Sequence, residues 1–232
     1  CKKNIGSLLT AHIRRAIMTT SDNERGPKMT DWKAQQMARE AAAKALQAAN
    51  PKLVAVGKDY GKNDSLNAAA KNIRIELAQA FPGVKFSVKS SRFSGGDSIT
   101  VSWTDGPNGA QVDAIIDRYS AGSFDGMVDL YTYERNAWTD AFGDAKYINS
   151  SRKASDKAVE SCLRTLRSKY GAAAIGDATV EQFRNGKLYE VYPFPNITNG
   201  DWSLQSMLHK ELARRTWMVA KKPAAQQLAE VA

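Results

Sequence analysis

The sequence predicts an α+β protein: a small antiparallel sheet in a helix–strand–strand–helix–strand module, with additional N- and C-terminal helices. The hydrophobic period over residues 66–133 switches from helical to alternating, back to helical and then to alternating again. Such switches are typical of a compact module that combines helices with strands. Glycine and proline residues separate the segments, as turns between elements require. This order of elements places the helices on one face of the sheet.

The first half of the module is a helix followed by a hairpin. The helix is predicted over residues 67–80, because apolar residues recur there at helical spacing and Pro82-Gly83 stops it. Residues 84–90 and 99–103 alternate between apolar and polar side chains, which predicts two antiparallel strands with glycines in the connection. The apolar positions of these elements are Ile73, Leu77, Phe81, Val84, Phe86, Val88, Ile99, Val101 and Trp103.

The second half is a helix that ends at Gly122 and a last strand that begins near Met127 and includes Val128, Leu130 and Tyr133. Further helices flank the module, since their apolar residues recur every three or four positions. The predicted flanking elements are helices at 4–17, 31–50, 155–170 and 201–219 and short strands at 53–56 and 188–194.

Four parts follow from these elements. They are an N-terminal helix and linker (1–30), an Ala-rich helix and loop (31–65), the α+β module (66–135) and a basic helical C-terminal region (150–222). Because the chain begins at Cys1, we expect the natural start to be another residue, with Met18 and Met29 as candidates.

The net charge of +9 lies outside the module. Residues 1–30 hold six Lys and Arg against two Asp and Glu, residues 31–150 hold 14 of each, and residues 151–232 hold 13 against eight. Basic flanks indicate a polyanionic partner, such as nucleic acid, a nucleoprotein complex or an acidic protein surface. Simple solubility is the alternative explanation for this charge.

Cysteine content and hydropathy indicate a soluble, cytoplasmic protein. Cys1 and Cys162 are far apart in the sequence, which predicts a reducing compartment and no disulfide framework. No apolar run approaches the roughly 20 residues that a membrane helix needs. The apolar stretch near the N-terminus is interrupted by His12, Arg14 and Arg15, which is unlike a signal peptide.

A set of short motifs occurs in the segment KNIRIELAQAFPGVKFSVKSSRFSGGDSITVSWTDGP and in YSAGSFDGMVDLYTY, which follows it. The motifs are Ile73-Arg74, Leu77, Phe81-Pro82-Gly83, Lys85-Phe86-Ser87-Val88, Phe93-Ser94-Gly95-Gly96, Trp103-Thr104-Asp105-Gly106-Pro107 and Gly122-Ser123-Phe124-Asp125-Gly126-Met127. With them, residues 66–133 resemble the large polyvalent protein-associated domains of phages and conjugative elements. The resemblance implies a small α+β domain, a mobile genetic element and a bacterial host. Such domains occur in proteins that accompany incoming DNA and act against host defences, and the family supplies no catalytic residues to carry over.

Few residues have the spacing of a catalytic or metal site. His12 and His209 lack Cys, His or acidic residues at ligand spacing, so neither a zinc site nor a His-dependent triad is expected. Asp125 and Asp129 are four residues apart, and such a pair can hold Mg²⁺ for nuclease chemistry. A third acid or a catalytic Lys in motif spacing is missing. We therefore expect no enzyme, no cofactor and no metal, and a metal-dependent nuclease is the less favoured alternative.

A hairpin tip and basic helix faces are the candidate binding sites. Ser94-Gly95-Gly96 joins two alternating strands, which favours a hairpin turn over a phosphate cradle. Phe93 beside this turn can stack on a base, fill a pocket of a partner or fold back over the sheet. The other candidates lie mainly in the basic region that follows the neutral module. The predicted partner- or nucleic-acid-binding residues are Lys89, Arg92, Phe93, Lys153, Arg164, Arg167, Lys169, Arg214 and Arg215.

The resemblance and the basic flanks together favour a non-enzymatic counter-defence protein, of anti-CRISPR or anti-restriction type. Such a protein would bind a host nucleoprotein complex, either a CRISPR effector or a restriction enzyme, and block or displace it. The alternative is a general DNA- or RNA-binding accessory protein that escorts mobile DNA, for which we expect steeply salt-dependent binding to naked nucleic acid. No membrane partner is expected.

Overall fold

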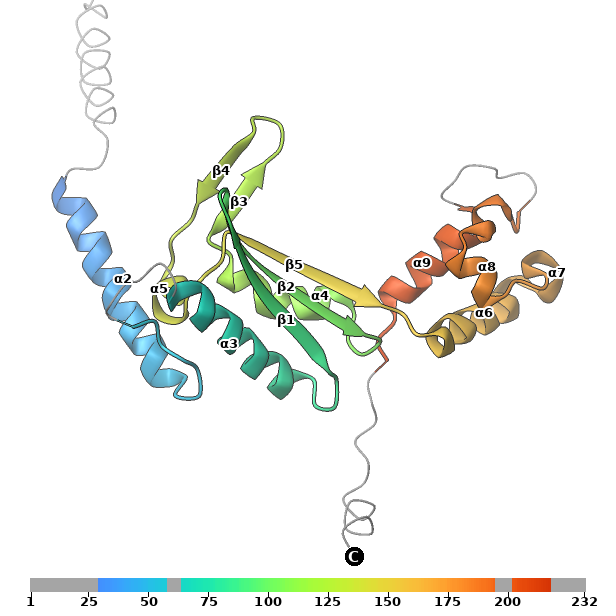
Figure 1. Ribbon diagram of the computed structural model, residues 1–232, viewed down its shortest axis with the longest axis horizontal. Helices are drawn as coiled ribbons and strands as arrows, with labels where there is room; N and C mark the ends of the chain where they lie inside the picture. Colours follow the sequence, from blue (N-terminus) through green and yellow to red (C-terminus); the bar gives the residue numbers. More distant parts are fainter. Residues whose placement is uncertain (1–28, 58–63, 195–201, 218–232) are drawn as a thin grey trace, which may run out of the picture.

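A computed structural model describes residues 29–57, 64–194 and 202–217 (Figure 1). The predicted helix at residues 4–17 lies outside the described residues, as do the linker at 19–28 and the end of the predicted helix at 201–219. The predicted fold class is confirmed: the chain combines small sheets with several helices, including helices before and after the central module.

A three-stranded sheet forms the centre of the module. Strands β1 (Phe86–Phe93) and β2 (Gly96–Thr104) pair antiparallel, with Val88 opposite Val101. The connection between them is the short turn at Ser94 and Gly95, as the hairpin interpretation predicts. The third strand, β5 (Tyr147–Lys153), pairs parallel with β2, so the order in the sheet is β1-β2-β5. A parallel pair needs a long crossover, and here it contains both a helix of the core and a second hairpin.

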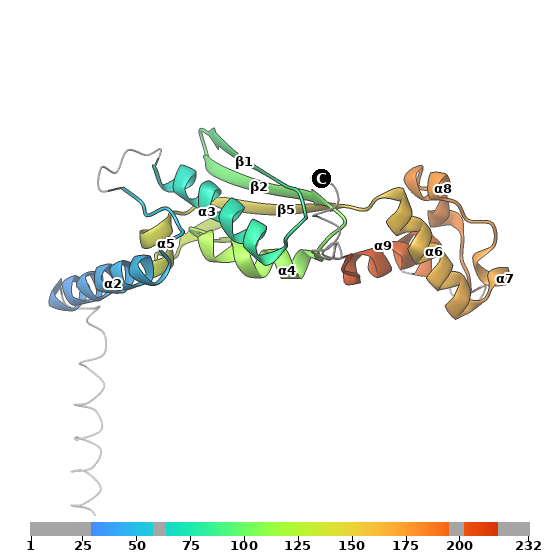
Figure 2. The same cartoon turned by 90° about the horizontal axis from the view of Figure 1, so that it is seen from below.

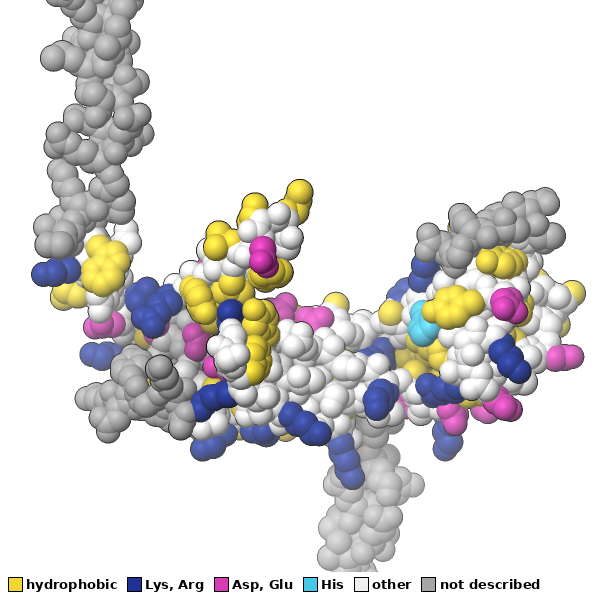
Figure 3. Space-filling model, turned by 45° about the horizontal axis from the view of Figure 1, so that its top comes forward, with side chains coloured by type: hydrophobic (Ala, Val, Ile, Leu, Met, Phe, Trp, Pro, Cys, Tyr) yellow, Lys and Arg dark blue, Asp and Glu magenta, His cyan; other side chains and the backbone are white. Residues whose placement is uncertain are grey.

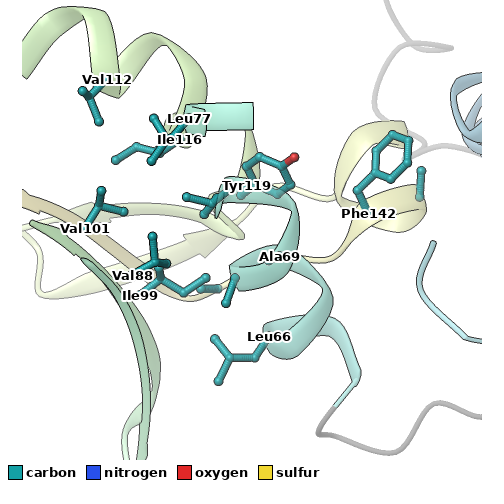
Figure 4. Packing of buried hydrophobic residues seen from close by; sticks show 14 of the residues in the cluster. Leu66, Ala69, Leu77, Val88, Ile99, Val101, Val112, Ile116, Tyr119 and Phe142 are labelled. Carbon is teal, nitrogen blue, oxygen red and sulfur yellow. The ribbon is translucent and has the colours of Figure 1, made fainter. Parts of the chain in front are cut away.

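Two helices cover one face of this sheet. Helices α3 (Asp64–Ala80) and α4 (Gly109–Ile116), the latter extended by η1 (Asp117–Tyr119), lie on the same side of the strands (Figure 2). Their apolar stripes meet alternate residues of the strands, because successive side chains of a strand point to opposite faces. Figure 4 shows this packing between Val88, Ile99 and Val101 of the sheet and Leu77 and Ile116 of the helices.

An N-terminal helix packs on the edge of the module. Helix α2 (Met29–Ala49) lies against α5 (Ala137–Phe142), where Ala43 is buried and Gln47 donates to the Ala141 carbonyl at 3.1 Å. The predicted strand at residues 53–56 is wrong. Its backbone groups bond instead to the side chain of Asn72 and to the Ala141 carbonyl, which leaves no partner strand for it.

The predicted last strand of the module joins a different sheet. Only Leu130–Tyr133 forms a strand (β4), and it pairs antiparallel with β3 (Gly122–Asp125) in a separate two-stranded ribbon. The place of the third strand in the main sheet is taken by β5, which the sequence analysis did not predict. The ribbon projects away from the module (Figure 1).

The C-terminal region forms a second, helical core. Its elements are α6 (Asp156–Tyr170), α7 (Ala172–Ile175), α8 (Val180–Arg184), η2 (Lys187–Glu190) and α9 (Leu204–Arg214). Ser155 caps α6, as its side chain accepts from the Ala158 amide, and this helix agrees with the prediction to within a residue. The predicted strand at 188–194 is wrong, because η2 occupies its first half. Leu163, Leu166, Leu204 and Leu208 lie at the centre of this core.

Candidate functional site

The face of the main sheet opposite the helices is open to solvent. We call it the open face, and its side chains come from alternate positions of β1, β2 and β5: Ser87, Lys89, Ser91, Phe93, Ser98, Thr100, Ser102, Thr104, Tyr147, Asn149, Ser151 and Lys153. Most of these side chains are exposed, and the rest are half-buried. Hydroxyl and amide groups dominate the surface, two lysines are its only charges, and none of these side chains is acidic. Hydrogen-bonding groups and positive charge are the features that polar, anionic ligands need.

An aromatic strip lies at one end of the open face. Phe93 and Tyr147 stack with ring centroids 6.2 Å apart, and Phe93 is still 50% exposed. Tyr147 meets Tyr131 of β4 edge-on at 5.6 Å, and Tyr131 meets Tyr133 at 4.7 Å. The four rings therefore continue from the tip of the β1–β2 hairpin onto the β3–β4 ribbon. We call these four residues the aromatic strip.

Lys146 fixes the position of this strip. Its Nζ lies 5.0 Å from the ring of Tyr131 and 5.2 Å from that of Tyr147, and it donates to the Gly95 carbonyl at 2.8 Å. A cation near aromatic rings is attracted to their faces. The Lys146 side chain also requires Gly96, because a Cβ at Gly96 would lie 2.6 Å from Lys146 Cδ. Lys146 thereby ties the hairpin tip to the strip.

The hydroxyl of Tyr131 has a pKa above its ordinary value. Burial raises the pKa of Tyr131, and the nearby rings of Tyr133 and Tyr147 add to the rise, while a hydrogen bond with Ser120 opposes it. Tyr131 donates its hydroxyl to the Lys146 carbonyl at 2.6 Å. Tyr131 therefore adds no negative charge near neutral pH, and the lysines are the charged side chains of the open face.

A hollow of about 820 Å³ lies at the opposite end of the open face. Its lining includes Ser87, Ser102 and Lys153 from the open face, together with Lys85. The eight residues of β1 cover the path from this hollow to the aromatic strip, which is about 26 Å at roughly 3.3 Å per residue.

Three of the predicted binding residues share the open face. These are Lys89, Phe93 and Lys153, which come from the two outer strands β1 and β5. Arg92 belongs to the other register of β1, opposite Asp97, and so lies off the open face. Of the interpretations left open for Phe93, the structure shows that it lies over the sheet against Tyr147, with half of its surface exposed.

The five basic residues of α6 and α9 do not form one surface. Arg167 donates to the Gly176 and Ala178 carbonyls, at 3.3 and 2.7 Å, and holds the turn that follows α7. Arg215 binds Glu211 at 2.6 Å and Thr165 at 2.8 Å. Arg164 is exposed beside Arg167 in one hollow, whereas Lys169 and Arg214 line a different hollow. Arg167 and Arg215 thus hold the helical core together.

The aspartate pair lies at the end of the β3–β4 ribbon. The Asp125 carboxylate accepts from the Met127 amide at 2.9 Å, and Asp129 has a positive φ of 51°. Both roles are typical of turn residues. Within residues 29–57, 64–194 and 202–217, no three His, Cys, Asp or Glu side chains gather closely enough to hold a metal ion.

Lys146 and the three tyrosines of the aromatic strip, Tyr131, Tyr133 and Tyr147, were not predicted from the sequence as site residues. The sequence contains only a weak signal for strand β5. Its open-face residues are Tyr147, Asn149, Ser151 and Lys153, and Ile148 is the single apolar residue at the positions between them. None of the helices in the described part of the chain is long and apolar enough to cross a membrane.

Of the comparisons with known proteins, only the one with family models found a match. No curated protein and no solved structure matches the chain. One family model matches residues 64–155, which is less than half of the chain. The match extends beyond the motifs quoted above, through β5 to the start of α6. It suggests an association with phages or other mobile elements. Residues 64–155, which contain the main sheet, both of its covering helices and the β3–β4 ribbon, match the family model of large polyvalent protein associated domain 29.

Proposed function

We propose that this chain is a non-enzymatic binding protein of a mobile genetic element, and that its open face contacts nucleic acid in a host nucleoprotein complex. The observation that carries the proposal is the aromatic strip at the end of a polar, acid-free sheet face with Lys89 and Lys153. Flat rings stack on unpaired bases of any sequence, and lysines neutralise phosphates. The contact therefore suits single strands better than duplexes.

The family match supports a proposal for the biological role. A domain associated with mobile elements, joined to a nucleic-acid-binding face, fits a counter-defence protein of anti-CRISPR or anti-restriction type. By occupying an unpaired guide or target strand of a CRISPR effector, or a single strand exposed in a restriction complex, the open face would block that complex. The same face favours a second candidate, an accessory protein that coats mobile DNA itself, because stacking needs no protein partner.

The first test is binding of the purified protein to a fluorescent 12-nucleotide single strand, followed by anisotropy. Phe93→Ala is expected to weaken binding about 5- to 100-fold, since stacking contributes roughly 1–3 kcal/mol per base. Lys89→Gln with Lys153→Gln should reduce the slope of log affinity against log salt by about 1.4, which corresponds to two phosphates of a single strand. Lys33→Gln with Lys44→Gln, both exposed on α2, is the matched control. Unchanged affinity in the Phe93 and lysine variants would contradict the proposal.

The variants that test helix α6 must avoid residues that support the fold. Arg167 supports the fold, so its reversal would confuse loss of binding with loss of structure. Arg164→Glu with Lys169→Glu changes only exposed side chains. If these helices also contact the polyanion, this variant weakens binding and flattens its salt dependence. An unchanged salt slope would remove α6 from the site.

Purification of the tagged protein from bacteria with active CRISPR and restriction systems separates the two roles. Recovery of defence subunits that resists nuclease treatment supports the counter-defence role. Recovery of nucleic acid alone, lost on nuclease treatment, supports the escort role. The Phe93→Ala protein is the matched control in both cases.

A further inference from the structure

The end of the β3–β4 ribbon carries a cluster of exposed apolar side chains. Met127 is 96% exposed, Val128 65% and Leu130 57%, and Phe124 on the neighbouring strand is 53% exposed. Figure 3 shows hydrophobic and acidic side chains together on this projecting ribbon. Large apolar side chains gathered on a protruding element usually mark a contact with another molecule. We call Phe124, Asp125, Met127, Val128, Asp129 and Leu130 the acidic tip.

The acidic tip is held in one shape. Asp125 pairs with Leu130 across the ribbon, and its carboxylate accepts from the Met127 amide. At the base of the ribbon, the strands approach so closely that a Cβ on Gly122 would lie 1.9 Å from the Thr132 carbonyl oxygen. A shaped tip loses little conformational entropy on binding, so it can use its apolar surface efficiently.

The negative charge of the acidic tip favours a partner surface that carries cations. Residues 122–133 contain two aspartates and no Lys or Arg, in a chain whose net charge is +9. Phosphates of nucleic acids and of anionic lipids repel such a tip. A complementary surface has apolar side chains at its floor and cations at its rim.

The same chain carries such a surface between α6 and α9. A hollow of about 250 Å³ there is surrounded by Lys169, Lys210 and Arg214. Apolar side chains complete it, namely Leu166, Tyr170, Trp202 and Met207. Glu211 also borders the hollow, but it pairs with Arg214 and Arg215. We call this the basic hollow.

We propose that the acidic tip of one copy inserts into the basic hollow of a second copy. The ribbon and the α6–α9 pair lie in different parts of the molecule (Figure 1), so one chain does not fill its own hollow. Met127 and Val128 would enter the apolar floor, and the two aspartates would face Lys169 and Lys210. Two copies that insert their tips into each other would form a two-fold dimer, whereas head-to-tail contacts would build rings or open chains.

Sedimentation velocity tests the proposal on nucleic-acid-free protein. The mean mass should rise above 25.4 kDa with concentration, over a range of about 5 to 500 µM, because a contact this small is weak. The tip variant is Asp125→Asn, Met127→Ser and Asp129→Asn, since Asn keeps the acceptor and tolerates positive φ. The hollow variant is Lys169→Gln with Lys210→Gln. Each variant alone should stay at the monomer mass.

Mixing the two variants gives the decisive result. The tip variant keeps an intact hollow and the hollow variant an intact tip, so the mixture should form 1:1 dimers and nothing larger. Lys157→Gln with Lys187→Gln, exposed lysines outside the hollow, should associate like the unchanged protein. A monomeric unchanged protein at every concentration would overturn the proposal, and so would a hollow variant that still associates by itself.

Discussion

The buried amide of Asn72 joins three segments of the chain. It has no exposed surface, its oxygen accepts from the Val54 amide at 2.6 Å, and its nitrogen donates to the carbonyls of Val54 and Phe142 at 2.9 and 3.0 Å. An amide suits this position because it both accepts and donates. The segment after α2 and the end of α5 are thereby held against α3.

Asn72→Asp should lower the free energy of unfolding by about 3 kcal/mol at pH 7, because two carbonyls lose their donor and a carboxylate enters a buried site. Urea denaturation measures the loss. Asn67→Asp, exposed on the same helix, is the control and should change stability by less than about 0.5 kcal/mol. Equal stability of the two variants would show that the amide network contributes nothing.

Asp144 makes stability depend on pH in the acidic range. Burial raises its pKa above the ordinary value of 3.8, while a hydrogen bond from the Ser65 hydroxyl opposes the rise, and the nearby Asp97 and Asp140 add to it. A raised pKa means that the folded state prefers the protonated acid. Its contribution is therefore favourable at low pH and is lost as pH rises through 3.8 and above.

Asp144→Asn keeps the acceptor for Ser65 and removes this dependence. Between about pH 3 and pH 7, the stability of the unchanged protein should fall relative to that of the Asn variant. Thermal unfolding of both proteins at the two ends of this range measures the difference. A relative gain for the unchanged protein on raising the pH would contradict the direction of the pKa shift.

At the scale of elements, Gly143 allows α5 to end against α3. Its φ is 87°, and a Cβ there would lie 2.2 Å from the Ser65 carbonyl oxygen. Gly171 has a similar φ of 90° but no atom within 4 Å of an added Cβ. An alanine at Gly171 would therefore suffer only from the unfavourable backbone angles, whereas an alanine at Gly143 would also clash with the Ser65 carbonyl.

Both glycines have φ and ψ that side chains rarely adopt, which costs roughly 1–3 kcal/mol. Gly143→Ala adds the clash with the Ser65 carbonyl oxygen, so it should destabilise the protein more than Gly171→Ala. Denaturant unfolding of the two variants compares them directly. Similar losses in both would mean that α5 can move away from α3 at little cost.

The elements that could be predicted from the sequence are those in which apolar residues recur at the period of a helix or a strand within the element itself. β1, β2 and α6 all have apolar residues at the period of their element, as at Val88, Val101 and Leu163. β5 was missed because its inward positions are Ile148, Ser150 and Arg152, so the alternation of apolar residues is absent. Its parallel partner is also distant in sequence, and the strand near Met127 was assigned to the sheet in its place.

In the candidate site, too, some residues could be predicted from local patterns and others come together only through the fold. Lys89, Phe93 and Lys153 could be named from charge and turn chemistry. Tyr147 and Tyr131 reach Phe93 only through the pairing of β5 with β2 and the fold of the ribbon. Local patterns do not contain that information.

At the scale of the whole molecule, Arg152 joins two separate cores. Its guanidinium donates to the carbonyls of Asp105 and Gly106 beside the sheet, at 3.0 and 3.1 Å. It also donates to those of Leu212, in the last turn of α9, and Arg215, directly after it, at 3.0 and 2.9 Å. Trp217 lies 4.7 Å from it and donates its amide to the Gly106 carbonyl at 2.8 Å. Burial lowers the pKa of Arg152, but arginine remains charged at neutral pH.

Arg152→Lys should uncouple the helical C-terminal core from the sheet. A lysine cannot reproduce four donors in a fixed fork, so about 3 kcal/mol of coupling should be lost. Hydrogen exchange should then show faster exchange in α6 and α9, with the amides of α3 and β2 unchanged, because the two apolar cores are separate. Arg164→Lys, exposed on α6, is the control and should leave both cores protected as before. Uniform loss of protection across both cores in the Arg152 variant would mean that the cores unfold as one unit, since the lost hydrogen bonds would then destabilise the sheet as much as the helices.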